Sequence, residues 1–205
     1  MARRKSISRT LATNCLLIVL AGCGRAVPRL DPPVIDAARA GEEALLEYDT
    51  NHDGVISGAE LDQCPGLKSA VKLYGSGDGK ITAAEITERI EKWQNNRVCM
   101  SPMAISLTLD GKPLEGATVT AEPEKFLGPA VPVATGVTNA YGTARPQVAP
   151  NRPGVFFGLY KLRISKKVDG KEKIPARYNK ETEIGFEKAP DAPGLRDLKL
   201  ELKSK

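Results

Sequence analysis

The sequence predicts an α+β protein with a helical N-terminal region and a β-rich C-terminal region. Between residues 34 and 96, apolar side chains recur at the three- and four-residue spacing of helices, whereas after Pro102 they alternate as in strands. Clusters of Gly, Pro and Asp separate the alternating segments, which is typical of turns. With 205 residues and 41% hydrophobic composition, the chain has room for one or two small domains.

Residues 1–22 carry the pattern of an export signal. The first residues are basic, and the apolar segment that follows is too short to span a membrane. Leu20-Ala21-Gly22-Cys23 resembles the lipobox of bacterial lipoproteins, in which the cysteine is acylated and becomes the N-terminus. The resemblance implies an exported protein held in the cell envelope by lipid on Cys23, with residues 23–33 as a tether. The alternative is an ordinary signal peptide cleaved near Ala21, with Cys23 incidental.

The formal net charge of +5 comes mostly from this leader. Residues 1–22 contain Arg3, Arg4, Lys5 and Arg9 and no acidic residue, and removing these four leaves 26 basic side chains against 25 acidic ones. A chain so close to neutrality gives no support to nucleic-acid binding, which needs a basic face. We therefore expect no nucleic-acid partner.

Residues 49–60 offer the oxygen donors that a calcium ion requires. Ca²⁺ takes six to eight oxygen ligands, from carboxylates, amides, backbone carbonyls and water. The segment resembles an EF-hand loop at every ligand position, with Gly54 where the loop must turn sharply. The alternative is an Asx-rich surface turn. The ligands that the resemblance implies are Asp49, Asn51, Asp53, Val55 through its carbonyl, Ser57 and Glu60.

Residues 74–85 repeat this pattern with fewer acidic ligands. Aligned on Gly79, the ligand positions hold Ser76, Asp78, Lys80, Thr82 and Glu85. Tyr74 stands at the first position, where a carboxylate belongs, so we expect one strong calcium ion and a weak, degenerate second site. Ile56 and Ile81 occupy the same position of the two loops and are expected to join them by a short β contact. Together these features predict a compact EF-hand pair over residues 34–98.

Capping signals bound the helices of this region. Asp-Pro-Pro at residues 31–33 predicts the start of the first helix. Ser57 with Glu60, and Thr82 with Glu85, have the spacing of capping boxes and predict two further helix starts.

Two cysteines flank the second loop. In an exported protein two leftover cysteines favour a disulfide, and the neighbours of Cys64 and Cys99 lack the pattern of a metal site. We predict that Cys64 and Cys99 are bridged; the alternative is two unpaired thiols.

Residues 104–203 carry three motifs of one β-sandwich family. The first is a G-x-P-x-x-G-A-x-V run from Gly111 to Val119, inside a predicted hairpin of residues 105–121. The others are T-x-x-x-G within residues 134–142 and G-x-Y-x-L-x-I at residues 158–164. These motifs resemble the carboxypeptidase-regulatory, transthyretin-like domain, which implies a Greek-key β-sandwich. Strands at residues 181–186 and 198–202 would complete its sheets.

The sequence gives no support to an enzyme. His52 is the only histidine and occupies a variable position of the first loop, whereas transthyretin-like hydrolases use histidines of the sandwich. A nucleophile elbow, a P-loop and a zinc motif are all missing. The whole arrangement is similar to short bacterial lipoproteins in which a compact EF-hand pair precedes a transthyretin-like sandwich.

We therefore predict a non-enzymatic, calcium-binding, lipid-anchored envelope protein whose sandwich is a binding or structural module. Its partner would be an envelope protein or a carbohydrate. One alternative is a dockerin-like module whose helical calcium region binds a partner protein. A second alternative is a carbohydrate-binding sandwich, which would need exposed aromatic residues on one face.

Overall fold

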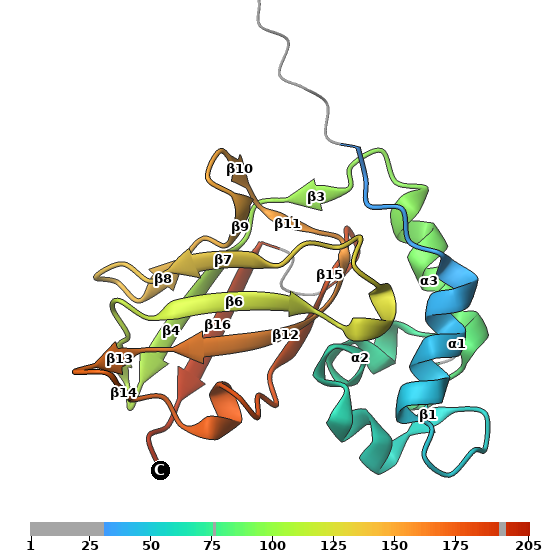
Figure 1. The fold of residues 1–205 in the computed structure, drawn as a ribbon, viewed down its shortest axis with the longest axis horizontal. Helices are drawn as coiled ribbons and strands as arrows, with labels where there is room; N and C mark the ends of the chain where they lie inside the picture. The colour runs from blue at the N-terminus through green and yellow to red at the C-terminus, as the bar shows by residue number, and fades with distance from the viewer. Residues whose placement is uncertain (1–30, 76, 193–195) are drawn as a thin grey trace, which may run out of the picture. The chain divides into compact units, whose positions relative to one another are not determined.

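Helices form the first part of the described chain and strands form the remainder, so the predicted α+β class is confirmed (Figure 1). The structure is a computed structural model that describes residues 31–75, 77–192 and 196–205. The predicted leader, lipobox and most of the tether lie outside the described residues.

The helical part contains three α-helices, two 3₁₀ turns and one short two-stranded sheet. These elements are α1 (Ala37–Tyr48), β1 (Ile56–Ser57), η1 (Gly58–Gln63), α2 (Pro65–Ala70), η2 (Val71–Leu73), β2 (Lys80–Ile81) and α3 (Ala83–Gln94).

Helix α1 begins later than predicted, because its cap is Asp36 rather than the Asp-Pro-Pro segment. The Asp36 carboxylate accepts the backbone N–H of Arg39 at 3.1 Å, which satisfies one of the free donors of the first turn. The helix packs along α3, and Gly41 makes the close approach possible. A β-carbon at Gly41 would collide with the carbonyl of Ala83 and the hydroxyl of Thr87 on α3.

Helix α3 begins at the predicted capping box. The Thr82 hydroxyl accepts the N–H of Glu85 at 3.2 Å, and the Thr82 N–H donates to the Glu85 carboxylate at 2.8 Å. The buried face of the helix carries Ile86, Ile90 and Trp93, as its apolar spacing predicts.

The β part consists of two main sheets and two short two-stranded pairs. One sheet has the strand order β10-β9-β7-β6-β12-β15, and the other contains β16, β4 and β5, with β8 also paired to β4. The strands are β3 (Met100–Ser101), β4 (Ala104–Leu109), β5 (Lys112–Pro113), β6 (Thr118–Pro123), β7 (Ala134–Val137), β8 (Thr143–Ala144), β9 (Gln147–Ala149), β10 (Arg152–Pro153), β11 (Val155–Phe156), β12 (Gly158–Ser165), β13 (Lys167–Val168), β14 (Lys171–Glu172), β15 (Gly185–Lys188) and β16 (Asp197–Leu202). Two further 3₁₀ turns are η3 (Lys125–Leu127) and η4 (Ala176–Tyr178).

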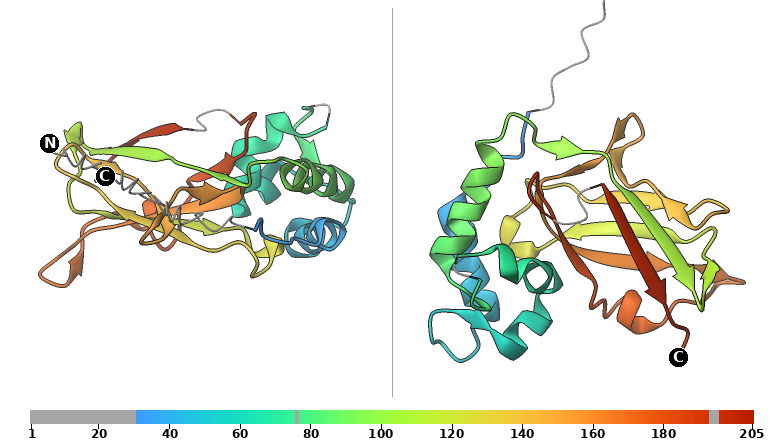
Figure 2. Two further views of the ribbon diagram at one scale, coloured as in Figure 1. Left: turned by 90° about the horizontal axis from the view of Figure 1, so that it is seen from above. Right: turned by 180° about the vertical axis from the view of Figure 1, so that it is seen from behind.

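The two main sheets lie in separate layers (Figure 2), and buried apolar side chains form the core. Ile105 and Leu107 of β4 and Val119 of β6 are fully buried, as the alternation of their strands predicts. Strand β12 is an inner strand of the six-stranded sheet, because it pairs with β6 on one side and with the edge strand β15 on the other. Its Leu162 and Ile164 are also fully buried, and the predicted strand at residues 158–164 is confirmed.

The predicted hairpin of residues 105–121 is wrong. Strand β4 pairs with β5, β8 and β16, whereas β6 pairs with β7 and β12 in the other sheet. The chain turns into β5 and then crosses between the layers at residues 114–117. Thr138 holds this crossing, because its hydroxyl accepts the N–H of Ala117 at 2.8 Å and donates to the carbonyl of Leu114. The crossing places the G-x-P-x-x-G-A-x-V run at an inter-sheet connection.

Two other strands differ from the prediction. The strand expected at residues 181–186 begins only at Gly185, where β15 pairs with β12. Strand β16 is found where predicted, but it runs parallel to β4 from the pair Asp197–Ala104 to the pair Leu202–Leu109. The second sheet is therefore mixed rather than purely antiparallel.

Helical and β parts belong to one compact unit, Asp31–Lys205. Helix α2 packs on the edge strand β15 and on β12 (Figure 1). Gly185 allows this contact, because a β-carbon there would collide with the backbone of Pro65 and Gly66. The helices thus cover an edge of the six-stranded sheet that would otherwise stay unpaired.

Candidate functional site

The first predicted calcium loop begins where helix α1 ends, and Asp49 organises its first half. The Asp49 side chain is only 7% exposed. One of its oxygens accepts the N–H of Gly54 at 2.9 Å, and the other accepts the N–H of Asp53 at 3.2 Å. Gly54 has a φ of +85° and His52 a φ of +59°, so the chain turns through two left-handed residues around the Asp49 carboxylate.

Glu60 closes the loop from its other end. One carboxylate oxygen accepts the N–H of Thr50 at 2.9 Å, and the other accepts the N–H of Ser57 at 3.0 Å. The Ser57 hydrogen bond, with those from Asn51 and Thr50, lowers the pKa of the Glu60 carboxyl. The side chain is only 8% exposed, so the last residue of the loop lies folded back on its first residues.

The remaining predicted ligands lie on the outer side of the loop. The Asn51 side chain accepts the N–H of Asp53 at 2.9 Å, and Asp53 accepts the N–H of Val55 at 3.1 Å. Asn51 and Asp53 are exposed, while Val55 and Ser57 are half-buried. The structure thus brings Asp49 and Glu60 inward at the two ends of the loop and leaves Asn51 and Asp53 facing solvent.

The donor chemistry of this loop fits calcium. The six predicted ligands offer only oxygen, which is the ligand type of a hard divalent cation. In the conformation described, the carboxylates accept backbone N–H groups. Within the described part of the chain, no three His, Cys, Asp or Glu side chains converge closely enough to hold a metal ion.

The second loop is differently built. Tyr74, at its first position, is 2% exposed, and burial raises the pKa of its phenol well above the ordinary value. Asp78 is exposed and accepts the N–H of Lys80 at 2.9 Å, while Glu85 caps α3 through Thr82. Ser76 lies outside the described residues. The first position is therefore part of the hydrophobic core and offers no ligand.

The two loops are joined as predicted. Ile56 of β1 pairs with Ile81 of β2 in antiparallel register, and both side chains are fully buried. The short sheet therefore holds the two loops side by side.

The predicted disulfide is wrong: Cys64 and Cys99 are both free. Cys64 is fully buried next to Tyr48 and Glu124, where burial raises the pKa of the thiol. Cys99 lies elsewhere, in a small cavity that Trp93 also lines. The prediction failed because the thiol of Cys64 is buried against Glu124 and Lys161 of the β part.

Glu124 is a buried polar residue that the sequence did not single out. Its side chain accepts the N–H of Gly66 at 2.8 Å and lies 3.2 Å from the ammonium of Lys161. Burial raises the pKa of Glu124, and the ammonium of Lys161 opposes that rise. These contacts tie α2 to β12. No local motif marks Glu124, because its partners are distant in sequence.

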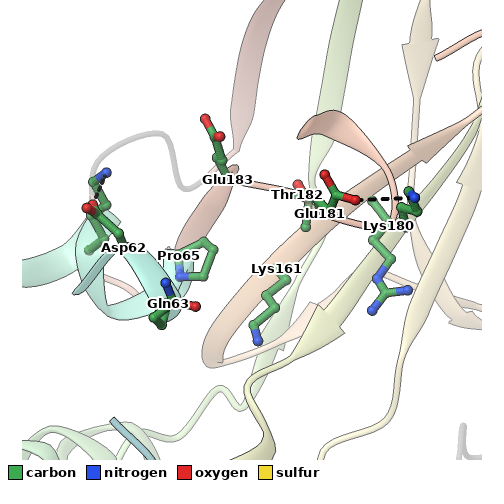
Figure 3. A pocket seen from close by; sticks show the side chains of 10 residues that line it. Asp62, Gln63, Pro65, Lys161, Lys180, Glu181, Thr182 and Glu183 are labelled. Carbon is green, nitrogen blue, oxygen red and sulfur yellow. Dashed lines mark hydrogen bonds and ion pairs between the residues drawn. The ribbon is translucent and has the colours of Figure 1, made fainter. Parts of the chain in front are cut away.

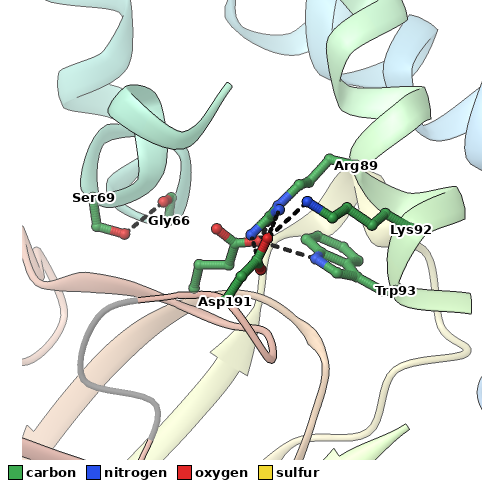
Figure 4. Close-up of polar contacts among 7 residues, drawn as sticks. Gly66, Ser69, Arg89, Lys92, Trp93 and Asp191 are labelled. Carbon is green, nitrogen blue, oxygen red and sulfur yellow. Dashed lines mark hydrogen bonds and ion pairs between the residues drawn. The ribbon is translucent and has the colours of Figure 1, made fainter. Parts of the chain in front are cut away.

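A second polar cluster joins α3 to the β part (Figure 4). The guanidinium of Arg89 donates to Glu187 at 2.6 Å and to both oxygens of Asp191 at 2.8 and 2.9 Å. Trp93 donates its indole N–H to Glu187 at 2.9 Å, and Lys92 reaches Asp191 at 2.8 Å. Arg89 and Glu187 are buried, so this is an interior ion pair rather than a surface one.

A polar cleft of about 590 Å³ lies between the helical part and the β part (Figure 3). One wall carries Asp62 and Gln63, two and three residues after Glu60, and the other is formed by residues 180–183. Lys161 lies between the walls. The cations of the cleft have carboxylate neighbours of their own, as in the pairs Lys68–Asp62, Lys180–Glu181, Arg163–Glu122 and Lys161–Glu124.

No model of a known protein family matches the chain, and no curated protein matches it. None of the helices in the described residues has the length and apolar character needed to cross a bilayer. The EF-hand and transthyretin-like resemblances therefore stay predictions.

Proposed function

We propose that the protein is a calcium-binding protein in which the loop of residues 49–60 holds one Ca²⁺. The observation that carries the proposal is the folding back of Glu60 onto the start of the loop, where its carboxylate accepts the N–H of Thr50. An ordinary Asx-rich turn does not need a carboxylate eleven positions after its first residue. When bound, the ion would supply positive charge between the Asp49 and Glu60 carboxylates, and its role would be to hold α1 and η1 together.

Calorimetry on the protein from residue 24 onward tests this proposal. We expect one binding site with a dissociation constant of about 10⁻⁴–10⁻³ M or somewhat tighter. Asp49→Ala should abolish it, and Asp49→Asn, which keeps one hydrogen-bond acceptor, should weaken it strongly. Glu85→Ala is the matched control from the second loop and should leave the affinity nearly unchanged.

Circular dichroism of each variant separates lost binding from lost folding. Two sites of similar affinity, or heat of binding that survives Asp49→Ala combined with Glu60→Ala, would count against a single first-loop site. No heat in the unmodified protein would remove calcium from the function altogether.

We further propose that the protein is exported and anchored by lipid on Cys23. The support is the lipobox pattern at residues 20–23, which follows the apolar segment directly. Cys23→Ala should move the protein from the membrane fraction to the soluble fraction, and labelled fatty acid should enter only the unmodified chain. Two or three acyl chains are needed for firm anchoring, and the fractionation is carried out in high salt, which screens charge-based binding and leaves only the lipid anchor to hold the protein. Equal sedimentation of both forms, with no label incorporated, would contradict the anchor.

The β part is proposed to be a non-enzymatic binding module of transthyretin-like type, and the polar cleft that it forms with the helical part is proposed as the ligand surface. The support is the position of the cleft, because Asp62 and Gln63 of its wall follow Glu60 of the calcium loop. We expect Lys161→Met and Gln63→Ala to reduce capture of an envelope partner. Val133→Ser, at an exposed position outside the cleft, is the control.

The dockerin-like alternative has one observation in its favour. Leu46 on α1 is 86% exposed and lies at a hollow lined also by Glu43, Glu47 and Phe126. If the helical region grips the partner, Leu46→Glu should abolish capture and the cleft variants should not. A carbohydrate-binding face has less support, because Tyr141 is the one aromatic among the strongly exposed large apolar residues of the described chain.

A further inference from the structure

Lysines gather on a hairpin that projects from one end of the β part. Strands β13 and β14 pair Lys167 with Glu172 and Val168 with Lys171, and the hairpin extends beyond the two main sheets (Figures 1 and 2). It carries Lys166, Lys167, Lys171 and Lys173. Among the ion pairs of the described residues, none involves these four lysines.

The hairpin is held in shape by its own turn and by the carboxylate of Glu172. Asp169 and Gly170 at the tip have φ values of +52° and +75°, as a tight two-residue hairpin turn requires. The Glu172 carboxylate accepts the Ser165 hydroxyl at 2.6 Å and the N–H groups of Lys166 and Ile174 at 2.9 Å. The acidic group of β14 is therefore engaged at the base of the hairpin.

Further cations lie at the same end. Asn179 donates to Glu172 at 3.0 Å and so connects the hairpin to the adjoining turn η4. Arg177 of η4 donates to the carbonyl of Lys203 at 2.9 Å and to the terminal carboxylate of Lys205 at 2.8 Å, which fixes the last residues beside it. The N–H of Ser204 donates to Asp110 at 3.1 Å, next to β5 and its exposed Lys112.

This basic end concentrates charge in a protein that is nearly neutral. We define it by Lys112, Lys166, Lys167, Lys171, Lys173, Arg177, Lys203 and Lys205. These eight cations are accompanied by the carboxylates of Asp110, Asp169 and Glu172, by Glu181 and Glu183 beside η4, and by the C-terminal carboxylate. Residues 23–205 hold 26 basic and 25 acidic side chains, so the rest of that span has 18 basic and 20 acidic ones. The protein is electrically polarised, with one positive end.

Apolar side chains accompany the cations. Val168, near the tip of the hairpin, is 41% exposed. Tyr141, in the turn between β7 and β8, is 83% exposed, and this turn lies at the same end of the sheets (Figures 1 and 2). Lysines with exposed tyrosine and aliphatic side chains at the same end of a protein are suited to a membrane–water interface, where charge meets headgroups and apolar groups enter beneath them.

We propose that the basic end docks on an anionic lipid surface. A lipid surface fits better than a small soluble anion, because the lysines are spread over both strands of a projecting hairpin. The proposal requires neither calcium nor acylation of Cys23, since it rests only on residues of the basic end and its neighbouring turn.

Vesicle flotation tests the proposal, using the protein from residue 24 onward, which keeps the whole compact unit. We expect binding to vesicles that contain phosphatidylglycerol, little binding to pure phosphatidylcholine, and release in high salt. Each lysine near an anionic surface contributes about fivefold in partition coefficient. Replacing Lys166, Lys167, Lys171 and Lys173 together by Gln should therefore reduce binding on the order of a hundredfold or more.

The matched control removes four cations elsewhere. Lys72, Lys80, Arg97 and Arg152 are exposed and lie outside the basic end, so their joint replacement by Gln gives the same net charge. This control should keep most of the vesicle binding, whereas Val168→Ser with Tyr141→Ser should weaken it by a smaller factor than the lysine variant.

Equal losses in the two quadruple variants would overturn the proposal, because net charge rather than the basic end would then decide binding. Equal binding to neutral vesicles, or no binding to either kind, would overturn it as well. Retention on double-stranded DNA without vesicle binding would replace the lipid surface by a nucleic acid.

Discussion

Replacing Arg89 by Met tests how the helical and β parts are held together. The Arg89 and Glu187 side chains are 6% and 2% exposed, and their nearest atoms are 2.6 Å apart. Methionine fills similar space but leaves the Glu187 carboxylate buried with only the Trp93 N–H as its donor. Removing one partner of a buried ion pair costs about 3–5 kcal/mol, so we expect a loss of this size in the free energy of unfolding.

The exposed ion pair of Lys92 with Asp191 provides a control for the buried one. Asp191 is 45% exposed and Lys92 is 64% exposed, so their pair contributes less than about 1 kcal/mol. Lys92→Met should therefore cost under about 1 kcal/mol, which is a shift of about 2–4 °C or less in Tm for a unit of this size. Arg89→Met with Glu187→Gln should cost less than Arg89→Met alone, because the unpaired charge is gone.

Chemical denaturation followed by tryptophan fluorescence measures these differences, since Trp93 is the only tryptophan. Burial raises the pKa of Glu187, and the loss of Arg89 should raise it further. A carboxyl whose folded pKa is raised favours folding most below its unfolded pKa and loses that contribution as the pH rises. The cost of Arg89→Met should thus be smaller at pH 5 than at pH 8. Equal costs for Arg89→Met and Lys92→Met at both pH values would refute the reasoning.

Three further predictions follow from burial and hydrogen bonding. Ellman's reagent should modify Cys99 quickly and Cys64 only slowly in the folded protein, since Cys64 is fully buried with a raised thiol pKa. A count of one reactive thiol or fewer after denaturation would instead show that the two cysteines are bridged. Leu162→Ala should cost about 2–5 kcal/mol by thermal or chemical denaturation, whereas Leu46→Ala, at an exposed position, should stay within about 0.5 kcal/mol. Burial opposes ionisation of Glu172, but the Ser165 hydroxyl and three N–H groups lower its pKa to about 2. Its contribution to the free energy of unfolding is therefore present above its unfolded pKa and is lost as the pH falls toward 2. Glu172→Gln should flatten the acid side of the plot of unfolding free energy against pH, and an unchanged acid side would contradict this role.

The sequence alone determined the features that depend on a few neighbouring residues. The capping box of Thr82 and Glu85, the pairing of Ile56 with Ile81 and the strand at residues 158–164 all appear where they were predicted. The cap and the strand rest on hydrogen bonding and side-chain periodicity that are complete within one short stretch of chain, whereas the Ile56–Ile81 pair followed from the repeat of one loop pattern at residues 49–60 and 74–85. The α+β class followed from the same local periodicities.

Only the tertiary structure decided which strands and side chains meet. It separated β4 and β6 into different sheets and turned Tyr74 into the core. It placed Cys64 beside Glu124 rather than Cys99, and it paired Arg89 with a glutamate 98 residues away. These contacts join segments that are distant in sequence, so the pattern of neither segment contains its partner. Burial then decides which residues become partners. A charged or polar group that is removed from water needs a hydrogen-bond or ion-pair partner, and here that partner lies where the helical part packs against the β part.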